Sequence, residues 1–227
     1  MTSFAAASPA QAPERAADVL PSLVARLEEE IVLGQARPGQ RLIEDELILR
    51  LGAKRHVVRQ VLVELERIGL IDRIPNRGAV VKSWSRAEVE HLYAVRALVE
   101  TEAARTMPLP GAPGLVAALT QVQAEHDAAV SEGDSIRAFH ANQAFHRALF
   151  GASGNPVLAA TIEDLARQAH GVRFHSLSDP RGLERARREH WRIIKAIEAG
   201  DRKTLVGLCA AHLPPSQTAY LKAQRSA

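Results

Sequence analysis

A succession of short helical patterns, glycine turns and one hairpin pattern occupies the first third of the chain and limits the folds it can adopt. Apolar residues recur at three- and four-residue spacing over 19–33, which predicts a helix with one buried face. Shorter helical patterns cover 44–51 and about 54–68, with a glycine between them. Residues 70–74 and 79–82 have the pattern of two strands joined by a tight turn. This order is typical of a winged helix-turn-helix, in which the helix after the glycine turn enters the major groove of DNA.

Positive charge is concentrated in the same region. Between Arg50 and Lys82 there are eight Lys or Arg against three Asp or Glu, a local excess of five, whereas the whole chain has 29 against 26. An excess of this kind suits a polyanionic partner. Charge alone does not distinguish such a surface from an ordinary solvated helix face.

The predicted basic helix and the wing offer candidates for DNA contact. Arg55 and Arg59 are four residues apart, so they share one face near the start of the helix, where guanidinium groups can reach guanine O6 and N7. At the wing tip, Arg77 suits the negative potential of the minor groove and Gly78 permits close approach. The predicted DNA-binding residues are Arg50, Lys54, Arg55, His56, Arg59, Arg77 and Gly78.

The rest of the chain has almost only helical patterns. We expect a mostly α protein with a disordered tail over 1–13, a winged helix-turn-helix domain over 14–83 and an all-α helical bundle over 84–227. Pro214 and Pro215 should kink or restart the last helix. The expected helices of the bundle are 86–106, 114–132, 135–151, 156–176, 183–199 and 202–224.

Cysteine usage and hydropathy bear on the compartment. Cys209 is the single cysteine, so no intramolecular disulfide can form, which fits a reducing environment. The sequence has no apolar run near the roughly 20 residues that span a bilayer, and residues 1–13 lack the pattern of a signal peptide. We therefore expect a cytoplasmic protein without a membrane partner.

Several motifs in register resemble those of the GntR regulators, in the FadR-like branch that carries the helical effector domain called FCD. In the N-terminal part they are Pro38-Gly39-Gln-Arg-Leu42, Leu51-Gly52, Val58-Arg59-Gln60-Val-Leu62 and Pro75-Asn76-Arg77-Gly78. In the C-terminal part they are Arg96-Ala-Leu-Val-Glu100, Phe145-His146-Arg-Ala-Leu149, Ser153-Gly154-Asn155, Glu189-His190 and His212. The resemblance implies a one-component transcription regulator that binds operator DNA as a homodimer under the control of a small effector.

The chain departs from that family pattern at two places in the DNA-binding part. The run Lys54-Arg55-His56-Val57 stands where family members commonly have Ser-Arg-Thr-Pro, so the operator half-site can differ. Asp45 replaces a basic residue often found early in the second helix and cannot make its phosphate contact. That contact is either missing or supplied by Lys54 or Arg50.

The resemblance also implies a divalent metal inside the bundle, held by a carboxylate and three histidines. The matching residues are Asn142, His146, His190 and His212. Asn142 stands where the family has Asp, and a neutral amide oxygen is a weaker ligand than a carboxylate. We expect zinc, with manganese or nickel as alternatives. The other interpretation is that the three histidines are unrelated core or surface residues.

A carboxylate effector beside such a metal would require a cationic partner. Arg96 and Arg173 are the candidates, because each occurs in a helical pattern whose other residues are apolar enough to line a core. Arg96 has an equally good structural interpretation, an ion pair with Glu100 one helical turn further on.

The function expected from these features is a DNA-binding regulator controlled by a small organic acid, and not an enzyme. The effector would shift how the two subunits of a dimer space their winged helices against two operator half-sites. A metal-responsive regulator, in which the ion itself is the signal, is one alternative. A metal-dependent hydrolase is a weaker one, since the sequence has no His-Glu-x-x-His motif, phosphate-binding glycine loop or nucleophile elbow.

Overall fold

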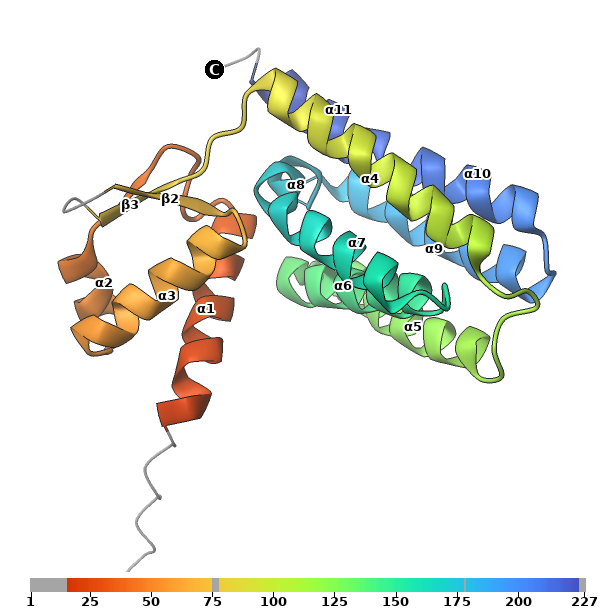
Figure 1. The fold of residues 1–227 in the computed structure, drawn as a ribbon, viewed down its shortest axis with the longest axis horizontal. Coiled ribbons are helices and arrows are strands. Elements are labelled where there is room, and N and C mark those ends of the chain that lie inside the picture. Colours follow the sequence, from red (N-terminus) through yellow and green to blue (C-terminus); the bar gives the residue numbers. More distant parts are fainter. Residues whose placement is uncertain (1–15, 75–77, 178, 225–227) are drawn as a thin grey trace, which may run out of the picture.

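The computed structural model describes residues 16–74, 78–177 and 179–224, which form a small N-terminal domain beside a larger bundle of helices (Figure 1). The expected tail at 1–13 and the wing residue Arg77 lie outside the described residues. The described helices include none that is both long enough and apolar enough to span a membrane.

The N-terminal domain is the predicted winged helix-turn-helix. Its three strands form an antiparallel sheet in the order β1-β3-β2, in which Leu42 pairs with Ala79 and Asp72 with Val80. The sequence pattern predicted the helices and the strands β2 and β3 to within a few residues. They are α1 (Ala16–Val32), β1 (Arg41–Leu42), α2 (Glu44–Leu51), α3 (Arg55–Arg67), β2 (Ile71–Ile74) and β3 (Gly78–Val81).

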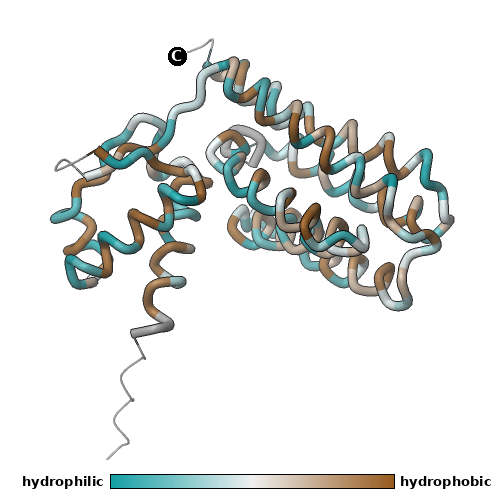
Figure 2. Tube along the Cα trace, viewed as in Figure 1, coloured by the Kyte–Doolittle hydropathy of each residue, from teal (hydrophilic) through white to brown (hydrophobic). Residues whose placement is uncertain are grey.

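One apolar cluster holds this domain together and decides which face of α3 is exposed. Leu27 of α1 and Leu47 of α2 are buried against Val58 and Leu65 of α3. Hydrophobic and hydrophilic residues alternate along the helices at helical spacing (Figure 2), as expected where only one face is buried. The basic face of α3 is therefore turned toward solvent.

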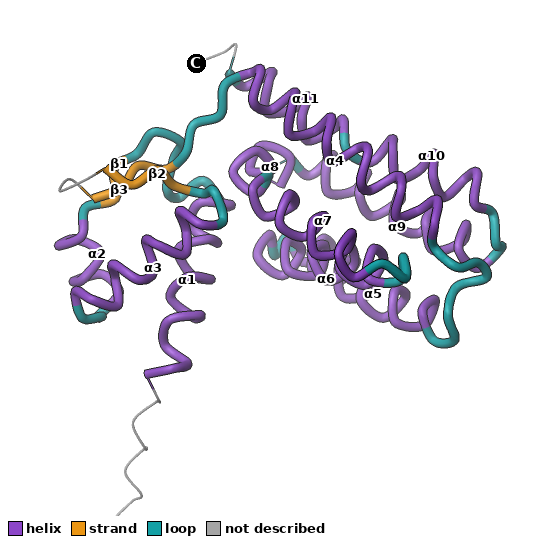
Figure 3. Tube along the Cα trace, in the orientation of Figure 1, coloured by secondary structure: helices purple, strands orange, loops and turns teal. Residues whose placement is uncertain are grey.

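The C-terminal domain is the predicted all-α bundle. Helix α4 begins at a capping box, in which Ser85 accepts from the backbone of Glu88 and the Glu88 side chain accepts in return. Asp or Asn caps the start of α6, α7, α9 and α10, and loops are confined to the helix ends (Figure 3). The helices are α4 (Arg86–Thr106), α5 (Leu115–Glu132), α6 (Ser135–Gly151), α7 (Pro156–Gln168), α8 (His170–Leu177), α9 (Pro180–Glu198), α10 (Arg202–His212) and α11 (Pro214–Ala223).

The single helix expected over 156–176 is wrong, because the chain turns at Ala169 and forms two helices. No proline marks this turn, and the nearest glycine, Gly171, lies within α8. Helix α8 packs against α11 and also against α1 of the other domain, and a straight continuation of α7 would lose these contacts. The expected restart at Pro214 is confirmed, while α9 begins three residues earlier than expected, capped by Asp179.

The junction between the domains is fixed on the bundle. Trp84 is buried in an apolar cluster of the C-terminal domain, and its backbone amide donates to the Tyr220 hydroxyl at 3.1 Å. A second connection lies outside the junction, where Val32 at the end of α1 is buried with Phe139 of α6. The winged helix domain is therefore joined to the bundle both along the chain and through α1.

Candidate functional site

The exposed face of α3 presents the two predicted base-reading arginines. The side chains of Arg55 and Arg59 are 54% and 60% exposed. Arg55 Nη2 lies 2.7 Å from Oδ1 of Asp45, and Arg59 Nε lies 3.0 Å from Oε2 of Glu44. Exposed ion pairs such as these contribute about 0–1 kcal/mol each. They orient the guanidinium groups without preventing them from moving onto DNA.

The remaining basic candidates of this domain lie in different environments. Lys54 and His56 are exposed at the start of α3, close to Arg55. Arg50 is paired with Glu30 of α1 at 2.7 Å, which the sequence pattern did not indicate. Lys54 is consequently better placed than Arg50 for a phosphate contact.

Asp45 should weaken DNA binding. Its carboxylate forms an ion pair with Arg55 and adds a negative charge next to the face of α3 that we expect to meet DNA. We expect Asp45→Asn to raise the affinity for duplex DNA by about 1 kcal/mol, roughly fivefold. The measurement is fluorescence anisotropy with a 20-base-pair duplex at two salt concentrations. Glu46→Gln removes an exposed carboxylate from the same helix turn and is the matched control. Equal affinity of Asp45→Asn and the parent would contradict this role.

Gly78 has a reason to be glycine that is independent of DNA. Its φ is +86°, and a Cβ added there would lie 2.5 Å from the backbone oxygen of Leu42 on the neighbouring strand. The sequence predicted a DNA-contacting glycine, and the structure shows in addition a steric requirement within the sheet.

Gly78→Ala should therefore lower the free energy of unfolding by about 1–3 kcal/mol, because the strand β3 must move away from β1. Denaturant unfolding followed by circular dichroism measures this. Gly39 also has positive φ, +79°, but no atom lies within 4 Å of an added Cβ, so Gly39→Ala is the matched control. If both variants lose the same stability, the clash with Leu42 does not matter.

Three histidines from three helices meet inside the C-terminal domain. His146 of α6, His190 of α9 and His212 of α10 offer nitrogens that all lie within 4.8 Å of one another. Nε2 of His146 is 3.2 Å from Nε2 of His212. Residues far apart in the sequence thus form one cluster, here called the histidine triad.

The surroundings of the triad suit a metal ion. His190 Nδ1 donates to Oε1 of Gln123 at 2.7 Å, and His212 Nδ1 donates to Oε2 of Glu189 at 2.6 Å. These outer partners fix the rings so that Nε2 keeps a lone pair, which is how metal-binding histidines are usually held. Within the described part of the chain, the buried Nε2 of His190 has no hydrogen-bond partner.

The electrostatics around His146 and His190 favour neutral imidazoles, the form that coordinates metals. Burial, followed by the nearby His212, holds the pKa of His146 well below its ordinary value. Burial and the same neighbour do so for the pKa of His190. The role of Gln123 as a partner of His190 was not predicted, because a single glutamine in a helical pattern does not indicate a metal site.

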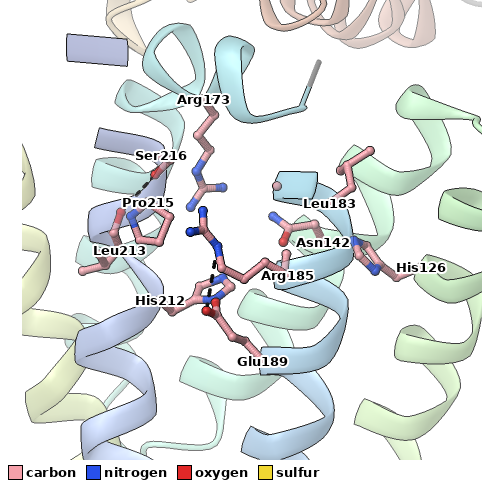
Figure 4. Close-up of a pocket in the computed structure, with 12 residues that line it drawn as sticks. His126, Asn142, Arg173, Leu183, Arg185, Glu189, His212, Leu213, Pro215 and Ser216 are labelled. Atoms are coloured by element: carbon pink, nitrogen blue, oxygen red, sulfur yellow. Dashed lines mark hydrogen bonds and ion pairs between the residues drawn. The ribbon is translucent and has the colours of Figure 1, made fainter. Parts of the chain in front are cut away.

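Asn142 lies on α6 at a small cavity of about 70 Å³ that His212 and Glu189 also line. Figure 4 shows its amide directed toward the same space as Arg173 and Arg185. The fourth expected metal ligand is thus on the same side of the bundle as the triad, one helical turn before His146.

A second, larger cavity of about 370 Å³ is lined by His146 of the triad. Its wall includes Arg96, Arg173 and His146 together with apolar residues such as Phe150 and Ile162. This volume and this mixture of apolar surface with a few polar groups are typical of small-molecule sites. We call it the effector cavity.

Both expected effector-binding arginines lie at this cavity. Arg96 forms the ion pair with Glu100, at 2.8 Å, and both side chains are almost fully buried. Nη1 of Arg96 has no hydrogen-bond partner among the described residues. Burial and Arg96 lower the pKa of Arg173 to about 10, and Tyr93 accepts a hydrogen bond from it. Arg173 therefore remains charged at neutral pH and gives this part of the cavity wall a positive charge.

Comparisons with known proteins agree with this architecture. The repressor RspR of Escherichia coli K12 is 26% identical to this chain over 187 residues, which cover 82% of each chain. The HTH-type regulator YdhC of Bacillus subtilis strain 168 is 24% identical over 188 residues, which cover 82% of this chain and 84% of YdhC. A crystal structure of a GntR-type protein from Rhodococcus sp. RHA1 has a TM-score of 0.75 at 21% identity, covering 91% of this chain and 99% of that one.

Two family models together account for most of the chain. Residues 21–81 match the bacterial regulatory proteins of the gntR family, and residues 91–214 match the FCD domain. These ranges coincide with the winged helix-turn-helix and with the bundle that holds the histidine triad. The chain belongs to the GntR family of bacterial transcription regulators, in the group whose second domain is an FCD domain.

Proposed function

We propose that this regulator binds operator DNA as a homodimer and that an organic acid in the effector cavity controls this binding. Arg55 and Arg59 would read base edges, and Lys54 and His56 would contact DNA beside them. The other proposed DNA-binding residues are Arg50, Arg77 and Gly78. Membership in a family of transcription regulators supports a binding protein rather than an enzyme.

The observation that carries the proposal is the pair of arginines in the wall of the effector cavity. These arginines, Arg96 and Arg173, lie at a cavity of about 370 Å³ that apolar residues also line, with Glu100 and Glu163 as its acidic residues. Arg96 lowers the pKa of Arg173, and Glu100, which pairs with Arg96, counteracts this less strongly. An anion between the two arginines would relieve their repulsion. A carboxylate fits, because guanidinium groups bind carboxylates through paired hydrogen bonds.

A divalent metal, zinc in preference to manganese or nickel, would be held by His146, His190 and His212, with Asn142 as a weaker fourth ligand. When bound, the metal supplies a positive charge that attracts the acid. The residues of the chain orient the acid: the arginines fix its carboxylate, while Gln123 and Glu189 hold the imidazole rings. Replacement of the usual aspartate by Asn142 predicts weaker metal binding than in family members that have the carboxylate.

The test is a titration of the metal-loaded protein with succinate, L-malate, citrate and D-gluconate, with glycerol as the uncharged comparison. At least one acid should bind and change the affinity for an operator selected from a random duplex library. Arg173→Met should weaken acid binding by about tenfold or more, since a buried charge-assisted contact is lost. Arg188→Met removes an exposed arginine outside the cavity and should bind like the parent. No acid binding to the parent would refute the proposal.

A metal-responsive regulator is the second candidate, favoured by the buried triad with its outer partners. After removal of metal with a chelator, zinc alone should then change operator affinity at regulatory concentrations. If zinc changes only the response to an acid, the metal is a support for the effector and not the signal.

A further inference from the structure

His170 contacts both the effector cavity and the DNA-binding domain. It is the first residue of α8, is 1% exposed and lies in the cavity wall with Arg96 and Arg173. Its Nδ1 lies 2.6 Å from Oε1 of Glu28 on α1. Because α1 belongs to the winged helix-turn-helix, a single imidazole ring joins the cavity to the part of the protein that binds DNA.

The hydrogen bonding of His170 is incomplete on one side. A carboxylate can only accept, so Nδ1 donates to Glu28. The opposite nitrogen, Nε2, is buried and has no partner within the described residues. Burial lowers the pKa of His170, although Glu28 acts against this, so the ring is neutral and Nε2 is an acceptor. A ligand group that donates a hydrogen bond would satisfy it.

Two further contacts between described residues of α1 and the bundle lie outside the cavity wall. His140 Nε2 lies 2.6 Å from Oε1 of Glu29, the residue next to Glu28, but His140 is half exposed and is not part of the cavity wall. Phe139 packs edge-on against His170, with 5.1 Å between ring centroids, and is buried with Val32. Of these contacts, the bond from His170 to Glu28 is the one that a ligand in the cavity can reach.

We propose that His170 is the positioning residue through which an occupant of the effector cavity acts on the DNA-binding domain. The ligand would bind at Nε2 and so set the ring's orientation, which determines whether Nδ1 still reaches Glu28. Since Glu28 lies on α1, this contact biases the arrangement of the winged helix relative to the bundle. The inference rests on the proposed function, because it requires a ligand in that cavity.

The experiment uses two adjacent glutamates as a matched pair. Glu28→Ala removes the partner of His170, whereas Glu29→Ala removes the same charge one residue further along the same helix, from a contact of equal length. For the parent and both variants, one measures the dissociation constant of whichever of L-malate, citrate or D-gluconate binds the parent most tightly, because their hydroxyl groups can donate to Nε2 of His170. One then measures operator affinity with and without that acid. Succinate, which has no hydroxyl to donate, is the comparison.

We expect the parent and Glu29→Ala to change operator affinity by about tenfold on acid addition, within the usual range of allosteric coupling. Glu28→Ala should bind the acid within about threefold of the parent yet show less than about a twofold change in operator affinity, because the cavity is intact while the link to α1 is lost. An undiminished response in Glu28→Ala would overturn the inference while leaving the proposed function in place. If none of the four acids binds the parent, both the acid effector and this inference are overturned.

A second measurement does not depend on a variant that folds. In the parent with labelled histidine, the imidazole ¹⁵N signals of His170 should show Nδ1 protonated before ligand is added. Addition of the acid should then shift the Nε2 signal of His170. Unchanged His170 signals in the acid-saturated protein would overturn the inference as well.

Discussion

Replacing His146 by alanine should abolish tight binding of a divalent metal. His146 supplies one of the three nitrogens that converge within 4.8 Å, and the remaining pair with the neutral Asn142 makes a poor site. Elemental analysis of the purified parent should give about one metal ion per chain and that of the variant close to none. We expect zinc in preference to manganese or nickel.

The same substitution should remove the effect of a chelator on stability. A ligand that binds only the folded state, present at a thousand times its dissociation constant, stabilises it by about 4 kcal/mol. For a chain of this size each kcal/mol corresponds to about 2–4 °C in Tm. EDTA should therefore lower the Tm of the parent by about 10 °C and leave that of His146→Ala unchanged.

His126 provides the control for loss of packing. His126 is 1% exposed and its ring centroid lies 5.2 Å from that of His190, but it is not a member of the triad. His126→Ala should lose some stability through the cavity it creates while keeping the metal and the response to EDTA. Equal metal content in the parent and His146→Ala would show that the triad is not the metal site.

Local signals in the sequence were sufficient for most of the fold. The start of α4 was predicted to the residue, and the structure shows there a capping box of Ser85 and Glu88, whose spacing is visible in the sequence. The winged helix was predicted because glycines separate its short patterns: Gly52 lies between two helices and Gly69 between a helix and a strand, and both have positive φ in the structure. The turn at Ala169 could not be predicted, since it follows from the packing of α8 on α1 and α11, which no local pattern encodes.

The candidate site was predictable in its ligands and not in its surroundings. The triad was identified by resemblance, since nothing local links His146 to His212, 66 residues further on. Gln123 contacts His190, and Glu28 contacts His170, only because folding brings α5 beside α9 and α1 beside α8. Residues that position other residues leave no spacing in the sequence, so they become visible only in the structure.

Arg55→Ala should remove most of the sequence-specific DNA binding while leaving the fold and any bound metal intact. Arg55 lies at the first position of α3, more than half exposed, with Asp45 as an ion-pair partner that DNA can replace. A bidentate contact between arginine and guanine contributes about 1–3 kcal/mol of discrimination. The affinity for a duplex selected by the parent should therefore fall by roughly ten- to a hundredfold, and affinity for random DNA by much less.

Arg67→Ala distinguishes base reading from a general loss of charge. Arg67 is on the same helix, is 62% exposed and is also held by an ion pair, with Glu64 at 2.8 Å, but it lies at the opposite end of α3. Both variants lose one positive charge, so nonspecific electrostatic attraction to DNA falls equally in both. If Arg55→Ala and Arg67→Ala bind the selected duplex with equal affinity, α3 does not read bases through Arg55. The basic face of α3 would then be a phosphate-binding surface.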